Sequence, residues 1–338
     1  MDTFQINLQQ LLDAVRGAER VLILPHNNPD PDAIASAVAL RYLLEQKLSL
    51  TAKIAYTGII GRAENRALIR YLDYPLERLV AADLRAGAPI ALVDAQPGAG
   101  NNPMTNAADV TIVIDHHFLR ESSAAARFSD VRPEIGAAST MLVEYLQAAN
   151  LPLTPQLATA LFYGIKTDTL DLLRAATAAD RDAFCYLLPQ VDLVAASRFE
   201  HAQLSPAYFK SLVETLQSAH VYNNVIVAYL GTLQYPDLAA DMADLLLRMQ
   251  DCRWVICLGV YKETLFISVR TRNKRGAGQL VQTVVGNRGT AGGHGSMAGG
   301  QVPLNGVAPD VLVAQFRQQF LGLLNIAPDQ KGEPLLPA

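Results

Sequence analysis

Val21-Leu-Ile-Leu-Pro-His-Asn-Asn-Pro-Asp-Pro-Asp32 is an apolar run that changes abruptly into a polar segment. Its first four residues, Val21–Leu24, are all apolar, which is typical of a strand buried on both faces. The polar segment carries one histidine and two aspartates, and from residue 32 to residue 46 apolar residues return at helical spacing. The stretch therefore predicts a buried strand, a loop rich in ionisable side chains, and a helix.

Downstream residues repeat this alternation of short apolar runs and helical patterns. Strands are expected at 52–56, 90–93 and 110–114, and helices at 67–71, 137–150, 155–166 and 180–188. The helix at 155–166 has Thr154 as its N-cap and Pro155 in its first turn. Continuous apolar strands that alternate with helices predict a parallel sheet covered on both faces. We therefore expect an α/β fold whose first domain is built on a doubly wound parallel sheet.

The length of 338 residues predicts a second domain, because a single core stops growing at about 250–300 residues. Its expected strands are 224–230, 254–260 and 265–269, and its expected helices are 237–249, 278–285 and 308–324, with a glycine-rich segment at 289–300. This pattern indicates a second, smaller α/β domain. We expect a first domain at 1–195, a linker region at 196–215, the second domain at 216–326 and a frayed tail at 327–338.

The composition excludes several classes of protein. Half of the residues are hydrophobic and 18% are charged, which excludes a disordered chain. No apolar run approaches the roughly 18–20 residues of a membrane helix, and the N-terminus lacks the basic start and apolar core of a signal peptide. The three cysteines lie in apolar segments and fit buried thiols in a reducing compartment. We expect a soluble, cytoplasmic protein with no membrane partner.

Charge is distributed unevenly around a net value of −4. Residues 1–204 contain 17 Lys and Arg against 23 Asp and Glu, whereas residues 205–325 contain 10 against 7. An acidic first part suits a metal site, and a mildly basic second part suits a surface that binds anions. Chance explains a difference of this size equally well. The second part lacks the strong basic track expected for binding long nucleic acids.

Ionisable residues follow the ends of three predicted strands and one helix. They are His26, Asp30, Asp32, Asp94, Asp115, His116, His117 and Asp168. In a doubly wound sheet, ligands bind outside the carboxyl ends of the strands, so these side chains are expected at one edge. Carboxylates and imidazoles without cysteine suit Mn²⁺ or Mg²⁺ better than zinc. Taken singly, each has a simpler interpretation: Asp32 as a helix cap, the other acids as turn residues, the histidine pair as surface.

The same residues resemble a known family. His26-x3-Asp30-x-Asp32, then Asp94, then Asp115-His116-His117, then Asp168 in Gly164-Ile-Lys-Thr-Asp-Thr are similar to the four motifs of the DHH phosphoesterases. Residues 292–300, Gly-Gly-His-Gly-Ser-Met-Ala-Gly-Gly, resemble the signature of the DHH-associated C-terminal domain. The motifs occur in the right order over residues 26–300. The resemblance points to the oligoribonuclease or 3′-phosphoadenosine 5′-phosphate phosphatase branch and implies an active site between a catalytic domain and a substrate-binding domain.

The resemblance implies two Mn²⁺ ions, with Mg²⁺ as an alternative. Carried over by position, His26 and Asp30 would hold one ion, Asp32, His116 and Asp168 the other, and Asp94 would bridge both. Two such ions lower the pKa of a bridging water and hold both oxygens of an in-line displacement at phosphorus. The expected catalytic residues are Asp115, which would orient a histidine, and His117, which would contact the scissile phosphate or assist the leaving group. A purely structural role for His117 stays open.

In the second domain, the resemblance and the local chemistry predict substrate binding by Arg270, His294, Gly292 and Gly293. A guanidinium can hold a phosphate with two parallel hydrogen bonds. A glycine-rich turn lets backbone amides approach a phosphate closely. A tight structural turn is the alternative explanation of these glycines, and it is compatible with phosphate binding.

The expected activity is Mn-dependent phosphoester hydrolysis of a short nucleotide substrate. The leading substrates are short oligoribonucleotides, dinucleotides such as pApA or cyclic di-AMP, and 3′-phosphoadenosine 5′-phosphate. The alternatives are an inorganic pyrophosphatase or exopolyphosphatase-like hydrolase and a non-catalytic nucleotide sensor. Pro31 between the first two acids, Ala35-Ser36 after them, and Leu170-Asp171 after the last motif depart from the family pattern and leave the substrate open. The oligomeric state is also open and includes a homodimer.

Overall fold

The computed structural model describes residues 3–273, 275–327 and 330–336, without the side chains of Thr3 and His294. The chain divides into two compact units, Met1–Ala202 and Gln203–Ala338. The expected linker at 196–215 is mostly helical instead, because α8 (Leu193–Glu200) and α9 (Pro206–Ser218) extend into it. Each of these helices has an N-cap side chain that accepts a backbone hydrogen bond, Asp192 for α8 and Ser205 for α9.

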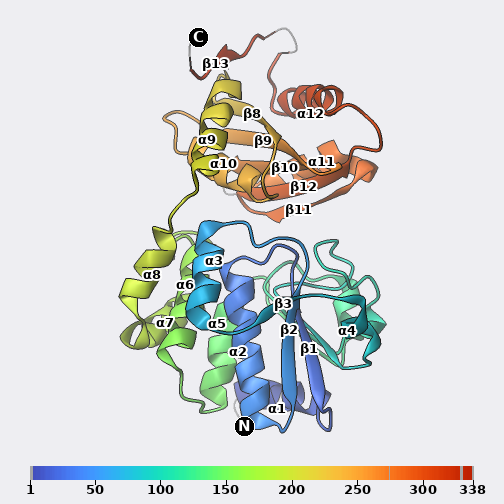
Figure 1. Ribbon diagram of the computed structural model, residues 1–338, viewed down its shortest axis with the longest axis vertical. Coiled ribbons are helices and arrows are strands. Elements are labelled where there is room, and N and C mark those ends of the chain that lie inside the picture. The colour runs from blue at the N-terminus through green and yellow to red at the C-terminus, as the bar shows by residue number, and fades with distance from the viewer. Residues whose placement is uncertain (1–2, 274, 328–329, 337–338) are drawn as a thin grey trace. The chain divides into compact units, whose positions relative to one another are not determined.

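The first unit is built on a six-stranded parallel sheet with the order β3-β2-β1-β4-β5-β6. Figure 1 labels β1, β2 and β3 of this sheet. Its strands are β1 (Arg20–Pro25), β2 (Thr51–Tyr56), β3 (Leu76–Arg78), β4 (Ile90–Val93), β5 (Ile112–Asp115) and β6 (Phe128–Val131). The predicted doubly wound parallel sheet is confirmed. The edge strands β3 and β6 were not expected from the sequence, because each is short and contains charged residues. The strand order reverses between β1 and β4, which is where such sheets bind ligands.

Both faces of this sheet are covered, but by different structures. On one face, α1 (Thr3–Ala14), α2 (Pro31–Lys47), α5 (Ala138–Ala148) and α6 (Pro155–Asp168) pack in a common core with Val21 and Ile23. On the other face, Leu22 and Leu24 pack against loop residues such as Met104. Alternate residues of β1 therefore enter two different cores, which explains why its sequence is apolar at consecutive positions.

The remaining helices of the first unit are α3 (Ala63–Leu72), α4 (Ala81–Arg85) and α7 (Ala178–Leu187), with short 3₁₀ turns at 107–109, 121–125 and 188–190. The N-cap and first-turn proline predicted for α6 are present, since the Leu157 amide donates to Thr154 at 3.2 Å and Pro155 is the first helical residue. Asp30 caps α2 by accepting from the Ala33 amide at 3.0 Å.

The second unit contains a seven-stranded sheet with the order β11-β12-β10-β9-β8-β7-β13. Its strands are β7 (His220–Tyr222), β8 (Val225–Thr232), β9 (Trp254–Tyr261), β10 (Thr264–Thr271), β11 (Thr290–His294), β12 (Met297–Pro303) and β13 (Glu333–Pro334). Neighbouring strands are antiparallel, except for β8 and β9. The glycine-rich segment is thus a hairpin of two strands. Residues 333–334 pair with β7 where a frayed tail was expected; residues 328–329 and 337–338 lie outside the description.

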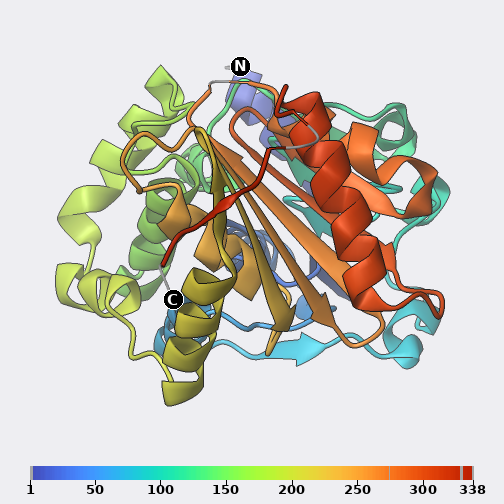
Figure 2. The same ribbon diagram turned by 90° about the horizontal axis from the view of Figure 1, so that it is seen from above.

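Two pairs of helices cover the second sheet (Figures 1 and 2). Residues of α11 (Ala277–Val285) and α12 (Pro309–Leu323) pack in one core with strand residues such as Ile267. Residues of α10 (Leu238–Leu246) and α9 pack in another core with Ile226. The expected smaller α/β domain is confirmed.

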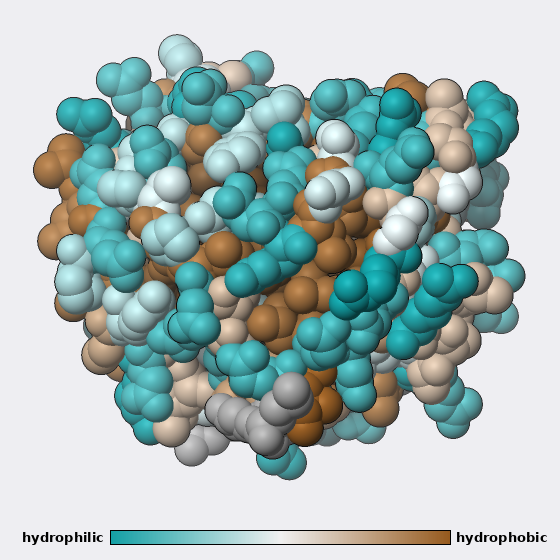
Figure 3. All heavy atoms as spheres, turned by 90° about the horizontal axis from the view of Figure 1, so that it is seen from below, coloured by the Kyte–Doolittle hydropathy of each residue, from teal (hydrophilic) through white to brown (hydrophobic). Residues whose placement is uncertain are grey.

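The described part of the chain has no helix whose length and apolarity would suffice to cross a bilayer. Figure 3 shows one face of the molecule, on which hydrophobic side chains gather near the middle and hydrophilic ones surround them. Exposed apolar side chains also occur at the ends of individual loops, and Phe118 and Leu173 are the most prominent of them.

Candidate metal centre

Six of the predicted ligands meet at the carboxyl end of the parallel sheet. His26 follows β1, Asp94 follows β4 and His116 follows β5, so three neighbouring strands each supply one side chain. The helices complete the set, with Asp30 and Asp32 at the start of α2 and Asp168 as the last residue of α6. The point at which the strand order reverses, between β1 and β4, lies inside this group.

His26, Asp30 and Asp94 form one cluster of ligand atoms. The Nε2 atom of His26 lies 3.6 Å from Oδ2 of Asp30 and 3.5 Å from Oδ2 of Asp94. One ligand atom from each residue lies within 4.8 Å of the others. An ion at their centre would be coordinated by one nitrogen and two oxygens.

Asp32, His116 and Asp168 form a second cluster with the same spread of ligand atoms. The Nε2 atom of His116 lies 3.2 Å from Oδ2 of Asp168 and 4.0 Å from Oδ2 of Asp32. It also lies 3.3 Å from Oδ1 of Asp94. Asp94 therefore faces both clusters, with Oδ2 toward His26 and Oδ1 toward His116.

The backbone at Asp94 has a conformation that non-glycine residues rarely adopt. Its φ is 54°, in the left-handed region. The Asp94 amide donates to the Ile114 carbonyl of the neighbouring strand at 2.9 Å, which fixes the residue beyond the end of β4. Such conformations cost free energy and concentrate at functional sites.

Hydrogen bonds from outside the clusters orient the acidic ligands. Asp30 accepts from the Ala33 amide through Oδ1, which leaves Oδ2 directed at His26. Asp32 is buried and accepts from the Ala138 and Ser139 amides at 2.7 and 2.8 Å. Those amides open α5, so the helix N-terminus stabilises the charged form of Asp32.

Hydrogen bonds to backbone carbonyls determine which ring nitrogen of His26 and of His116 carries a proton. His116 Nδ1 lies 3.2 Å from the Ile135 carbonyl, and His26 Nδ1 lies 2.8 Å from the Asn27 carbonyl. A carbonyl can only accept, so both Nδ1 atoms carry the proton. Each Nε2 then faces the carboxylates: it donates to them while the ring is protonated, and it offers its lone pair to a metal once that proton is lost.

Asp115 lies behind the clusters and holds His117. Its Oδ1 is 2.8 Å from His117 Nδ1 and accepts from the His116 amide at 2.9 Å. Its Oδ2 accepts from Gln96 Nε2 at 2.6 Å. The His117 side chain is 40% exposed, whereas Asp115 is buried. Asp115 thus positions a histidine that is open to solvent.

A close helix contact supports the second cluster. A Cβ atom at Gly164 would come within 2.5 Å of Ser139 Oγ and 3.1 Å of the Asp32 Cα. Glycine at this position therefore allows α6 to pack directly against the start of α2. This packing gives a physical reason for the glycine that precedes Asp168 by four residues.

The pKa values of the buried acids and imidazoles depend on the charges of their neighbours in the two clusters. Burial, together with the charges of Asp94 and Asp168, raises the pKa of Asp32 well above its ordinary value. Burial would lower the pKa of His26, but the hydrogen bond and charge of Asp30 outweigh it and raise that pKa to about 10. The acids are therefore compensated by protons on the imidazoles, a role that divalent cations would take over on binding.

One buried atom shows directly that the residues fit a metal. Asp94 Oδ1 is buried and has no hydrogen-bond partner among the described residues, although His116 Nε2 and His117 Nδ1 lie 3.3 and 3.4 Å away. An unsatisfied buried carboxylate oxygen is costly unless it coordinates a cation. The four acids, the imidazole nitrogens and the absence of cysteine from both clusters suit Mn²⁺ or Mg²⁺.

In the second unit, Arg270 is not an open phosphate-binding residue. It is 8% exposed, and its Nε and one terminal nitrogen face the two carboxylate oxygens of Asp244 at 2.6 and 3.4 Å. Its other terminal nitrogen donates to Ser268 Oγ and to the Val269 carbonyl. The fork expected to hold a phosphate therefore already holds a carboxylate.

Gly292 and Gly293 lie in β11, and the His294 side chain lies outside the described residues. Gly293 has a φ of 144°, and a Cβ there would collide with Ala298 and with the Met297 carbonyl. This glycine is required by the close pairing of β11 with β12.

Sequence reasoning missed two residues beside the metal centre. Gln96 is 2% exposed and connects Asp115 to the loop after His117. Burial raises the pKa of Asp30, but His26, the Ala33 amide and, with the smallest effect, Arg62 at the start of α3 together lower it below its ordinary value. The only signal for Gln96 was its position two residues after Asp94, and Arg62 had none.

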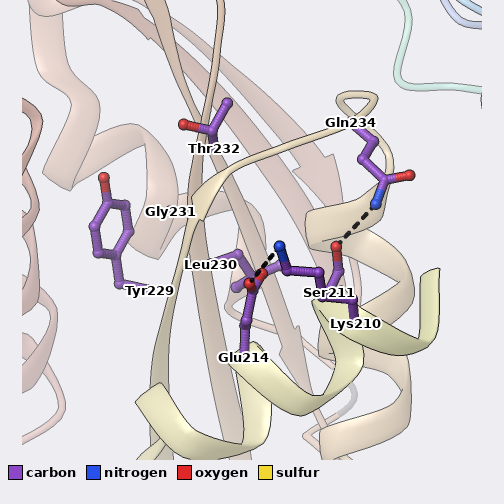
Figure 4. Close-up of a pocket in the computed structure, with 8 residues that line it drawn as sticks. All are labelled: Lys210, Ser211, Glu214, Tyr229, Leu230, Gly231, Thr232 and Gln234. Atoms are coloured by element: carbon purple, nitrogen blue, oxygen red, sulfur yellow. Dashed lines mark hydrogen bonds and ion pairs between the residues drawn. The ribbon is translucent and has the colours of Figure 1, made fainter. Parts of the chain in front are cut away.

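A separate hollow of about 530 Å³ lies in the second unit beside β8 and α9 (Figure 4). Lys210 and Glu214 form an ion pair at 3.8 Å on one side of it, and Gln234 Nε2 donates to Ser211 Oγ at 3.1 Å on another. These four polar side chains are thus paired with one another. It brings together no cluster of described metal-ligating side chains.

Comparisons with known proteins agree with this geometry. Residues 20–165 match the sequence model of the DHH family, N-terminal domain. An uncharacterized protein of Methanocaldococcus jannaschii is 34% identical over 286 residues, which cover 84% of this chain and 58% of that protein. A probable manganese-dependent inorganic pyrophosphatase of Deinococcus radiodurans is 33% identical over 172 residues, which cover 49% of this chain and 52% of that protein. The chain thus spans little more than half the length of these relatives.

A solved structure shows the same fold. The exopolyphosphatase-related protein from Bacteroides fragilis has a TM-score of 0.73 to this chain, with 18% sequence identity. The match covers 94% of this chain and 96% of that one. The fold of both units therefore occurs in a known protein.

Proposed function

The first unit carries a DHH-family N-terminal domain, and from this premise we propose that the protein is a metal-dependent phosphoesterase. The observation that carries the proposal is the position of Asp94, whose two carboxylate oxygens face two separate ligand clusters. A carboxylate shared between two ions suits an in-line displacement at phosphorus, because the ion pair can stabilise both the attacking and the leaving oxygen. A single structural ion would not require it.

We propose two Mn²⁺ ions, one held by His26, Asp30 and Asp94, the other by Asp32, His116, Asp168 and the same Asp94. When bound, such a pair supplies an activated water and stabilises the charge that develops on the phosphate. Imidazole ligands favour Mn²⁺ over Mg²⁺, which we retain as an alternative. The manganese in the name of the pyrophosphatase relative supports the choice.

We assign the protein's own proton chemistry to Asp115 and His117. The hydrogen bond from His117 Nδ1 to Asp115 fixes the ring, so Nε2 is the nitrogen that would reach the substrate. At this position it can hydrogen-bond the scissile phosphate or protonate the leaving oxygen. Asp115 acts through His117 and is a positioning residue.

We propose that the second unit contributes substrate contacts through Gly292, Gly293, His294 and Arg270. Because Arg270 is paired with Asp244, it can bind a phosphate only by sharing its guanidinium or by exchanging one anion for the other. The alternative is the backbone amides of the β11–β12 hairpin. They are our preferred anion contact in this unit.

The substrate we propose is a short nucleotide: an oligoribonucleotide, a dinucleotide such as pApA or cyclic di-AMP, or 3′-phosphoadenosine 5′-phosphate. The likeness to the pyrophosphatase covers 49% of the chain, whereas the likeness to the archaeal relative covers 84%. The likeness to the pyrophosphatase therefore says nothing of the remaining half of the chain. The pyrophosphatase relative nevertheless favours hydrolysis of pyrophosphate, or of the chemically related polyphosphate, as the second candidate function.

A substrate panel with Mn²⁺ tests the proposal. It should contain a pNpN dinucleotide, 3′-phosphoadenosine 5′-phosphate, cyclic di-AMP, pyrophosphate and polyphosphate, with Asp94→Asn as the matched inactive control. Release of mononucleotide or phosphate from a nucleotide, absent in the variant, supports the reading. Turnover confined to pyrophosphate or polyphosphate would select the second candidate. Binding of nucleotides with no turnover of any substrate would indicate a sensor.

A further inference from the structure

An exposed aromatic residue directly follows the last histidine of the metal centre in the chain. Phe118 follows His117 in the chain and is 72% exposed, whereas phenylalanines in the cores, such as Phe128 and Phe199, are 5% and 2% exposed. Leu119 is 63% exposed next to it. A single exposed apolar residue needs no explanation by itself. Phe118 differs from an ordinary exposed residue because buried hydrogen bonds hold its loop in place.

The backbone that carries Phe118 is held in place by one buried side chain. Gln96 Nε2 donates to the Phe118 carbonyl at 3.1 Å, and Gln96 Oε1 accepts from the Arg120 amide at 2.7 Å and from Ser123 Oγ at 2.8 Å. Gln96 is 2% exposed, so these bonds are shielded from water. The ring is thus presented to solvent from a fixed loop.

The same glutamine connects this loop to the catalytic histidine. Gln96 Nε2 also donates to Asp115 Oδ2 at 2.6 Å, and Asp115 Oδ1 holds His117 Nδ1. Gln96 itself lies two residues after Asp94. The position of Phe118 is therefore fixed relative to the residues that would bind the scissile phosphate.

A fixed aromatic face beside a phosphate-binding centre matches one part of a nucleotide. Bases stack on aromatic side chains with little dependence on sequence, because every base has a π-face. Pyrophosphate and polyphosphate have no apolar part that such a ring could contact. The loop after Asp168 exposes two further apolar side chains, Leu170 and Leu173. Exposed apolar residues therefore follow two of the candidate ligands in the chain, His117 and Asp168.

We propose that Phe118 forms a nucleobase subsite, on which the base next to the scissile phosphate stacks. This inference rests on the proposed function and narrows it to substrates that carry a base. Gln96 is then a positioning residue: it holds the backbone of Phe118 directly and the ring of His117 through Asp115.

The test compares a dinucleotide with an abasic dinucleotide of the same charge. Stacking on an aromatic side chain is worth about 1–3 kcal/mol, or about 5- to 150-fold. Phe118→Ala should lower kcat/KM for pNpN by that factor and leave the abasic compound unchanged. Phe118→Trp and Phe118→Tyr should retain the activity, whereas Phe118→Leu should not. Leu119→Ala, an equally exposed neighbour, is the control and should be neutral on both substrates.

Binding provides a readout that does not depend on turnover. The affinity of a non-hydrolysable dinucleotide, measured by calorimetry, should fall in Phe118→Ala by the same factor as kcat/KM. Equal losses on both substrates, or no loss on either, would overturn the subsite. So would a change of oligomeric state in Phe118→Ala without a change in base dependence, since the ring would then be a protein contact. If the wild type hydrolyses no phosphoester with Mn²⁺, the proposed function fails, and the binding comparison still decides the subsite.

Discussion

Gly164 in α6 lies so close to Asp32 in α2 that a Cβ atom on the glycine would come within 3.1 Å of the Asp32 Cα and 3.2 Å of its Oδ1. Asp32 is a candidate ligand of the second cluster, and Gly164 lies one helical turn before Asp168, another of its candidate ligands. The close packing of α6 on α2 therefore also fixes the position of the Asp32 carboxylate.

The first prediction follows from this contact. Gly164→Ala should displace Asp32 or Ser139, and we expect Mn²⁺ affinity to fall about tenfold and the protein to lose about 1–3 kcal/mol of stability from overpacking. Gly322→Ala in α12 is the matched control, because a Cβ there meets nothing within 4 Å. The control should gain about 0.5–1 kcal/mol from helix propensity. Thermal unfolding and Mn²⁺ titration measure both effects, and unchanged Mn²⁺ affinity in Gly164→Ala would contradict the argument.

Asp94→Asn should abolish hydrolysis while the fold stays intact. The substitution removes the charge shared by both clusters, and asparagine tolerates the left-handed backbone at this position as well as aspartate does. Steady-state rates and thermal unfolding of the variant are the measurements. Retention of more than about a tenth of the wild-type rate, or roughly 1.4 kcal/mol of barrier, would mean that Asp94 does not bridge two ions.

Mn²⁺ binding should release protons, and the apparent affinity should therefore rise with pH. The pKa of His26 is about 10 in the metal-free site, against the opposing effect of burial, because Asp30 stabilises the protonated ring. The ring must lose a proton before Nε2 can coordinate, so below pH 10 each ion bound to His26 displaces one proton. Calorimetry in two buffers with different ionisation enthalpies counts the protons. A pH-independent affinity between pH 6 and 8 would exclude His26 as a ligand.

The turn after Asp168 contains three consecutive residues in the left-handed region, with φ of 50° at Leu170, 57° at Asp171 and 65° at Leu172. Each costs about 1–2 kcal/mol. Leu170→Gly relieves this cost and loses about 0.4–1 kcal/mol through the unfolded state, so stability should rise by up to about 1.6 kcal/mol. Leu173→Gly is the control, because Leu173 is exposed and outside the left-handed region, and it should lose stability. Denaturant unfolding measures whether the free energy of unfolding rises in Leu170→Gly and falls in Leu173→Gly.

The sequence was most informative where local pattern decides structure. The buried strand at 21–24 and the helix starting after Asp30 follow from apolar spacing and a capping residue within a few positions. The pool of candidate ligands followed from placing strand ends at one sheet edge, and the resemblance to the DHH phosphoesterases assigned six of them to two ions, although Asp32 had a competing interpretation as a helix cap. In the structure Asp30 caps α2, and Asp32 binds the N-terminus of α5.

What the sequence could not predict depends on pairings between distant residues. Asp244 and Arg270 are 26 positions apart, and no local pattern indicates that one neutralises the other. The role of Gln96 depends on contacts with Asp115, Arg120 and Ser123, which the fold alone brings together. The edge strands β3 and β6 lack apolar runs because one side of each is open to solvent.

The pairing of Arg270 with Asp244 leads to the last prediction. If Arg270 also binds a substrate phosphate, Arg270→Ala removes a charge-assisted contact worth about 1.5–3 kcal/mol. We expect kcat/KM for a dinucleotide to fall by about 10- to 150-fold. An aryl phosphodiester that reaches only the metal centre should be hydrolysed nearly as before, because positioning by a remote contact is lost only for the longer substrate.

A second variant separates substrate binding from internal pairing. Asp244→Asn keeps the shape of the side chain and removes the anion that competes for the guanidinium. If the phosphate exchanges with Asp244, this variant should bind the dinucleotide more tightly than the wild type, which a lower KM with unchanged kcat would show. If Arg270 serves only to neutralise Asp244, both variants should lose stability without a change in the ratio of kcat/KM between the two substrates. Equal losses of activity on both substrates would assign Arg270 to the fold of the second unit.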